Sequence, residues 1–258
     1  MDTSEGTLRA LRAGAALYNA GEFHAAHDPW EERWLALGGD ADTDADASGG
    51  DATERRLLKG LVQSTAAVYH ATERNWVGAT GLADSAGEYL AAVEGSAAGG
   101  LALAPVRSYL AALAADPEVI ERRSPVRLEL DGTAVGPTDL EFEAAALAAL
   151  ALAEEYGYEE RVLERAVAFG RADLEAERAT SPFVALVFDF AAGTDRPLVY
   201  RRLEEHVDRR EHREADVAGL FDADGGESSG QRSSDSGDRV DRNGGADATD
   251  PGPGAGGP

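Results

Sequence analysis

The chain has 258 residues, a formal net charge of −24 and no cysteine. The missing cysteines exclude disulfides, thiolate metal sites and cysteine nucleophiles, and 48 acidic against 24 basic residues argue against binding to nucleic-acid phosphates. Only one of the basic residues is a lysine, Lys59. A diffuse acidic bias keeps a protein soluble by self-repulsion, as in halophiles, so we expect a protein of a salt-adapted cell.

The N-terminal segment, Met1 to Gly6, is acidic and has no apolar run. Nowhere does the sequence contain a stretch of about 20 apolar residues, the length needed to span a bilayer. We therefore expect neither a secretory signal nor a membrane span, and a soluble cytoplasmic protein.

Alanine-rich, periodic segments dominate the first half of the chain and predict helices. The first, over 7–19, has Leu8, Leu11 and Tyr18 on its apolar side, and Gly21 is placed to end it. Further helices are expected over 22–37, 53–75 and 77–93. An acidic loop, residues 38–51, with no apolar residue larger than alanine, separates the second helix from the third.

The second half begins with a flexible break and a short helix over 106–114. Residues 126–135 then alternate apolar and charged positions around Asp131-Gly132, which predicts a small β-hairpin, with an extended arm as the alternative. Helices are expected over 139–155, with Thr138 and Glu141 as a capping box, and over 159–178, 182–191 and 196–219. From about residue 222 too few apolar residues remain to offset the entropy of ordering, so the tail is expected to be disordered.

These elements predict an all-α protein, a multihelical bundle of αα-hairpins around a central buried helix. We expect an N-terminal helical domain over residues 1–116. A C-terminal helical extension over 117–221 would pack on it, and the disordered tail would occupy 222–258.

The stretch FHAAHDPWEERW, residues 23–34, carries the densest chemistry. In one continuous helix, where successive residues advance by about 100°, Glu31 lies one turn beyond His27, and His24 and Glu32 point elsewhere into solvent. A histidine and a carboxylate at this spacing can hydrogen-bond or share a metal. The stripe expected to be buried contains Phe23, His27, Trp30, Trp34 and Leu37.

Pro29 complicates a continuous helix, because it cannot donate a hydrogen bond and crowds the carbonyl of Ala25, at a cost of roughly 3 kcal/mol in a helix interior. The alternative is a helix that restarts here, with Asp28 as N-cap and Pro29 as the first helical residue. In both cases the backbone bends beside His27 and Glu31.

The third predicted helix has two packed faces, which makes it the central one. Leu57, Leu61 and Val68 mark one face, and Gln63 and His70 lie on the other. The small residues Gly60 and Ala67 on that second face allow another helix to approach closely. We infer that His27, Glu31, Gln63 and His70 converge in one polar cluster between the second and third helices, walled by Trp30, Trp34 and Tyr69.

Together the two segments LYNAGEFHAAHDPWEERW and LLKGLVQSTAAVYH resemble domain-of-unknown-function family 309, over about residues 10–95. Asp28 stands where the family usually has glutamate, and the acidic loop resembles an insertion. The resemblance implies a helical fold and a polar cluster but no activity. The matching positions are Phe23, His27, Asp28, Trp30, Glu31, Trp34, Gly60, Leu61, Gln63, Tyr69 and His70.

Two hypotheses for the function follow. In the first, the polar cluster is a structural hydrogen-bond network and the protein is a helical module that binds a protein partner or a second copy of itself. In the second, His27, His70 and Glu31 hold a divalent transition metal for a hydrolase or small-ligand enzyme, and Gln63 orients the substrate. No catalytic residue can be named, and no known metallohydrolase motif is present.

Overall fold

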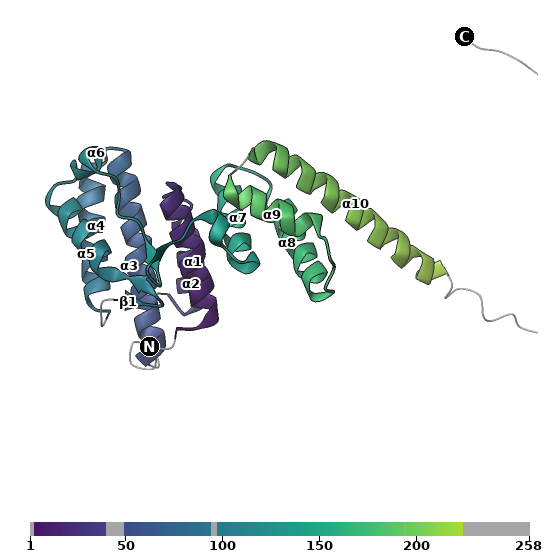
Figure 1. Cartoon of the computed structure of the whole chain (residues 1–258), viewed down its shortest axis with the longest axis horizontal. Coiled ribbons are helices and arrows are strands. Elements are labelled where there is room, and N and C mark those ends of the chain that lie inside the picture. Colours follow the sequence, from purple (N-terminus) through teal and green to yellow (C-terminus); the bar gives the residue numbers. More distant parts are fainter. Residues whose placement is uncertain (1–2, 40–48, 94–96, 194, 224–258) are drawn as a thin grey trace, which may run out of the picture. The chain divides into compact units, whose positions relative to one another are not determined.

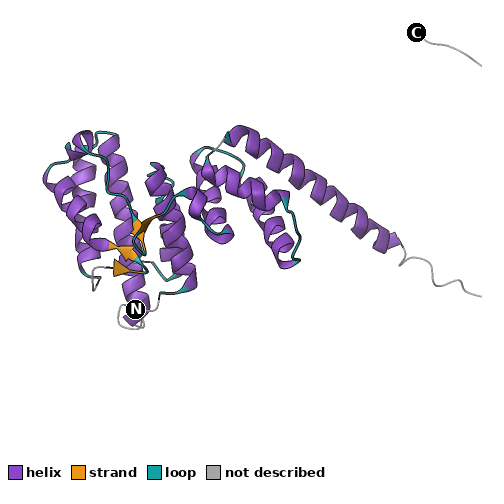
Figure 2. Ribbon diagram, in the orientation of Figure 1, coloured by secondary structure: helices purple, strands orange, loops and turns teal. Residues whose placement is uncertain are grey.

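The computed structural model describes residues 3–39, 49–93, 97–193 and 195–223. Most of the predicted acidic loop and nearly all of the predicted disordered tail lie outside these residues. Helices dominate the described chain, so the all-α prediction is confirmed (Figures 1 and 2). The chain up to Arg213 forms one compact unit. No helix in the described part combines the length and apolarity needed to cross a bilayer.

Four helices form the first part of this unit: α1 (Glu5–Ala20), α2 (His27–Ala36), α3 (Gly49–Thr72) and α4 (Trp76–Ala91). The helix α3 packs against both α2 and α4 and is the central helix that the two apolar faces predict. The end of α1 is set by Gly21, whose φ of 89° lets its N–H reach the carbonyls of the last turn. Asn75 begins α4 by accepting a hydrogen bond from the Gly78 N–H, at 3.1 Å.

The helices α5 (Leu103–Ala115) and α6 (Val119–Arg122) follow, together with a small antiparallel sheet. Its strands, β1 (Ala97–Ala98), β2 (Leu101–Ala102), β3 (Glu129–Leu130) and β4 (Thr133–Ala134), lie side by side in chain order. The predicted hairpin is β3–β4. Asp131 and Gly132 both have positive φ, 52° and 78°, as a tight two-residue hairpin turn requires.

Asn19, near the end of α1, fastens this hairpin to the helices. Its amide nitrogen donates to the carbonyls of Leu128 and Val135, at 2.8 and 2.9 Å, and its amide oxygen accepts from the Leu128 N–H at 2.8 Å. One side chain thus satisfies backbone groups on both flanks of the hairpin, which otherwise would need water.

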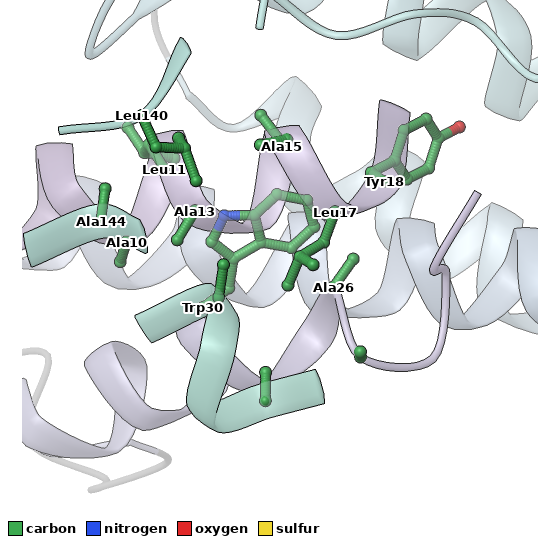
Figure 3. Close-up of a cluster of buried hydrophobic side chains, with 14 of the residues drawn as sticks. Ala10, Leu11, Ala13, Ala15, Leu17, Tyr18, Ala26, Trp30, Leu140 and Ala144 are labelled. Carbon is green, nitrogen blue, oxygen red and sulfur yellow. The ribbon is translucent and has the colours of Figure 1, made fainter. Parts of the chain in front are cut away.

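The last part contains a 3₁₀ turn, η1 (Pro137–Asp139), and the helices α7 (Phe142–Glu155), α8 (Glu160–Glu175), α9 (Pro182–Ala192) and α10 (Arg196–Ala223). The predicted capping box of Thr138 and Glu141 is wrong: α7 begins later, at Phe142, because the Asp139 carboxylate accepts from the Gly136 N–H and closes the 3₁₀ turn first. The helix α7 packs against α1 and α9. Leu140 and Ala144 thereby join the core around Trp30 (Figure 3).

Candidate functional site

The helix α2 begins at His27, after turns over residues 23–26, so the continuous helix over 22–37 is wrong and a restart is correct. The restart lies two residues earlier than expected, with Ala26 rather than Asp28 as the N-cap. Pro29 is then the third helical residue. The N–H groups of the first turn have no partner within a helix, so the missing N–H of Pro29 costs no hydrogen bond.

Trp30 belongs to the core rather than to the wall of a site. Its side chain is 1% exposed and lies against α1 (Figure 3). A Cβ placed on Gly14 would stand only 2.3 Å from the indole ring, so glycine is what allows the ring to approach α1. Trp34 is also buried, and the Nζ of Lys59 lies 3.8 Å from its ring centroid, a cation–π contact.

His27 is bonded through both of its ring nitrogens. Nδ1 faces the carbonyl oxygen of His24, and Nε2 lies 3.0 Å from the Asp28 carboxylate and 3.7 Å from that of Glu31. Both nitrogens face acceptor oxygens, an arrangement that favours the doubly protonated imidazolium form of the ring. The hydrogen bond to Asp28 is the largest cause that raises the pKa of His27 to about 9, although partial burial opposes it.

A row of rings continues from His27. The His24 ring lies 5.0 Å from that of His27 and 5.1 Å from that of Tyr69, which is 6.0 Å from His70. His24 Nδ1 also pairs with the Glu155 carboxylate at the end of α7. His24 is therefore half-exposed but engaged, contrary to the expectation that it points away into solvent. The Tyr69 ring contacts the rings of both His24 and His70.

The structure does not gather the four predicted cluster residues into one site. A Cβ on Gly60 would meet Leu90, so the face of α3 that carries Gly60, Gln63 and His70 packs against α4 rather than α2. His70 Nδ1 lies 3.0 Å from the Asn75 amide at the start of α4. The side-chain oxygen of Gln63 is buried without a hydrogen-bond partner in the described chain.

Because the predicted residues lie apart, they do not form a metal site. Among the described residues, no group of three or more His, Asp or Glu side chains is arranged to hold a metal ion. His27 and Glu31 are neighbours. His70 instead contacts the Tyr69 ring, which in turn contacts the His24 ring. A metal also needs the lone pair of a neutral imidazole, whereas both nitrogens of His27 face acceptors.

His27 and Glu31 instead line a groove of ≈ 460 Å³ between α2, α7 and α8. Leu35, Leu147 and Leu150 form its apolar part, and the Leu35 side chain is 60% exposed. Among the described residues that line the groove, His27 is the basic one. The acidic lining residues are Asp28, Glu31, Glu32, Glu154, Glu160 and Glu164.

A buried polar network does exist, but it is not the predicted one. The Glu54 carboxylate, on α3, accepts hydrogen bonds from the N–H and hydroxyl of Ser4 and from the Thr7 hydroxyl. Arg33 donates to Thr7 and Ser4, each at 3.0 Å. Burial opposes the charge of Glu54, but these hydrogen bonds outweigh burial and lower its pKa. Glu54 precedes Leu57 and Leu58 by three and four residues, a spacing that signals its inward position.

A second buried carboxylate, Asp173 of α8, joins the last three helices. It accepts from the Ser181 hydroxyl at 2.7 Å and lies 3.1 Å from the guanidinium groups of both Arg178 and Arg210. Burial alone would raise its pKa, but these partners lower it. The two buried carboxylates thus stabilise the fold and leave the groove as the candidate for binding.

Comparison with known proteins adds a family but no activity. No curated protein matches the chain. The matched family model, described as Domain of unknown function (DUF309), covers residues 11–82, which include the larger part of α1, all of α2 and α3, and the start of α4. Over residues 11–82 the chain is therefore similar to the DUF309 family, in agreement with the resemblance of its two helical segments.

Proposed function

We propose that the groove between α2, α7 and α8 binds a cationic, amphipathic segment of a partner protein. The observation that carries this proposal is the composition of the groove: six carboxylates surround three leucines. An apolar side chain of the partner would cover Leu35, which is otherwise exposed to water. Arginines beside it would meet the carboxylates, which attract the partner and orient it.

The size of the groove supports a segment rather than a whole domain as the ligand. A volume of ≈ 460 Å³ accommodates a few side chains. A helix with one apolar and one basic face presents such side chains at intervals of three and four residues. We do not propose a metal-assisted hydrolase, because His27 has no free lone pair for a metal in this arrangement.

A direct test uses a short synthetic helix with leucines on one face and arginines on the other, labelled for fluorescence anisotropy. The double variant Glu31→Gln/Glu160→Gln should bind it about tenfold more weakly, at roughly 0.5–1 kcal/mol for each exposed charge pair. The matched control, Glu73→Gln/Glu88→Gln, removes the same net charge from exposed positions in the turn after α3 and in α4.

The proposal predicts that the control binds like the unchanged protein. Equal weakening in the two double variants would show that only net charge matters and would refute a built site. A peptide whose leucines are replaced by serine should also bind more weakly. If that peptide or spermine binds equally well, the ligand is a polycation and not an amphipathic segment.

A further inference from the structure

Within the groove, the imidazole of His27 lies beside two of the carboxylates. Its Nε2 lies 3.0 Å from Asp28 and 3.7 Å from Glu31, so it already neutralises part of the carboxylate set that a cationic ligand would use. The side chain is 25% exposed, which leaves it within reach of a ligand but partly shielded from water. An interaction of this kind is screened less than one on the open surface.

The charged groups around His27 come from three helices and one turn. Asp28, Glu31 and Glu32 belong to α2, Glu154 to α7, and Glu160 and Glu164 to α8. The turn before α2 contributes the His24 carbonyl, and the His24 ring is itself paired with Glu155. Apart from the His24 ring, the charged groups named here are carboxylates, all of which favour a proton on His27.

We propose that His27 is a counter-ion built into the groove, and that a bound cationic side chain takes over its carboxylates and releases its proton. This inference rests on the proposed function and specifies how that site is regulated. The exchange conserves charge: one guanidinium arrives, and one proton leaves the imidazolium for the solvent. The ring that remains is neutral, so it no longer repels the ligand.

Linkage fixes the pH dependence. A ligand that favours the neutral form of His27 must bind more tightly as that form becomes populated. The pKa of about 9 in the free protein places the change in the alkaline range. Complete release of the proton changes affinity tenfold for each pH unit below 9, so affinity should rise by up to about 100-fold from pH 7 to pH 10. A groove lined by carboxylates without a histidine would show no such rise, because carboxylates are fully ionised throughout this pH range.

The experiment is calorimetric titration of the full chain with the arginine–leucine helix, its ends blocked, in two buffers of different ionisation enthalpy at about pH 8.5. Arginine does not titrate here, so any proton released comes from the protein. The unchanged protein should release a large fraction of one proton for each peptide bound. The variant His27→Gln should release none, bind more tightly at pH 7, and show an affinity independent of pH.

The control is His212→Gln, which removes a histidine of α10 outside the groove and should release protons like the unchanged protein. Binding without proton release in the unchanged protein overturns the counter-ion inference and leaves the proposed function standing, and this result needs no variant to fold. Absence of binding at every pH overturns the proposed function, and the inference with it.

Discussion

Replacing Gly14 by alanine should destabilise the protein, although the same change usually strengthens a helix. In a helix interior alanine is favoured over glycine by about 1 kcal/mol. At Gly14 the added Cβ would lie 2.3, 2.4 and 2.7 Å from three atoms of the Trp30 indole, distances that real Cβ atoms essentially never show. The ring would have to retreat by about 1 Å before the contact became ordinary.

The magnitude follows from the surroundings of Trp30. The indole is 1% exposed and packed among Ala13, Leu17 and Ala26, so it cannot retreat without displacing neighbours (Figure 3). Overpacking of this kind costs typically 1–3 kcal/mol, and complete loss of the packing of a buried tryptophan about 3–5 kcal/mol. After the gain in helix propensity, we expect a net loss of about 2 kcal/mol.

The matched control is Gly81→Ala in α4. Nothing lies within 4 Å of a Cβ at Gly81, so this variant should gain up to about 1 kcal/mol. The free energy of unfolding of both variants, from urea titration followed by tryptophan fluorescence, should therefore change in opposite directions. A Gly14→Ala protein as stable as the unchanged one would refute the tight approach of Trp30 to α1.

Three further predictions concern charged groups. Glu54→Gln should lower the free energy of unfolding in urea by about 2 kcal/mol at pH 7. This difference should vanish as the pH falls below 4.5 through the lowered pKa of Glu54, because both proteins then lack the charge. A difference that persists at low pH would contradict the role of the Glu54 charge. Asp173→Asn should cost about 3 kcal/mol, because it removes the buried carboxylate that faces Arg178 and Arg210. Trypsin should then cut after Arg178 faster than in the unchanged protein. The pKa of His27 is raised from 6.5 to about 9, so its pairing with Asp28 stabilises the fold fully below pH 6.5, and this stabilisation is lost as the pH rises through about 9. At about 1.4 kcal/mol per pKa unit, the loss is up to about 3 kcal/mol. Unfolding of His27→Gln should show no such loss, and identical pH profiles would argue against the pairing.

Local patterns predicted those elements whose cause lies within a few residues. Gly21 ends α1 and Asp131-Gly132 turns the hairpin, both as expected, and α9 begins at the expected residue 182. The sequence alone does not decide where α2 begins, because Pro29 is compatible both with a kinked helix and with a first turn. The structure decides between these alternatives, because residues 23–26 form turns and not a helix.

The candidate site was less predictable, because it depends on which helices meet. A helix with two apolar faces does not specify which neighbour covers which face, and the face of α3 with Gly60 and His70 meets α4. The groove depends on α7 and α8, more than a hundred residues after His27, and no pattern within α2 indicates them. Glu54 could have been recognised from its position beside Leu57 and Leu58, but acids are so frequent in this chain that one more attracts no notice.

The hydrogen bonds of Asn19 reach beyond the segment that the family model matches. The family match ends at residue 82, yet Asn19, within the match, bonds the backbone at Leu128 and Val135, beyond it. At the other end, Ser4 precedes the match and bonds Glu54 inside it. A fragment of residues 11–82 would therefore expose amide and carboxylate groups that the whole chain satisfies. The segment that the family model matches is thus shorter than the hydrogen-bonded unit to which its residues belong.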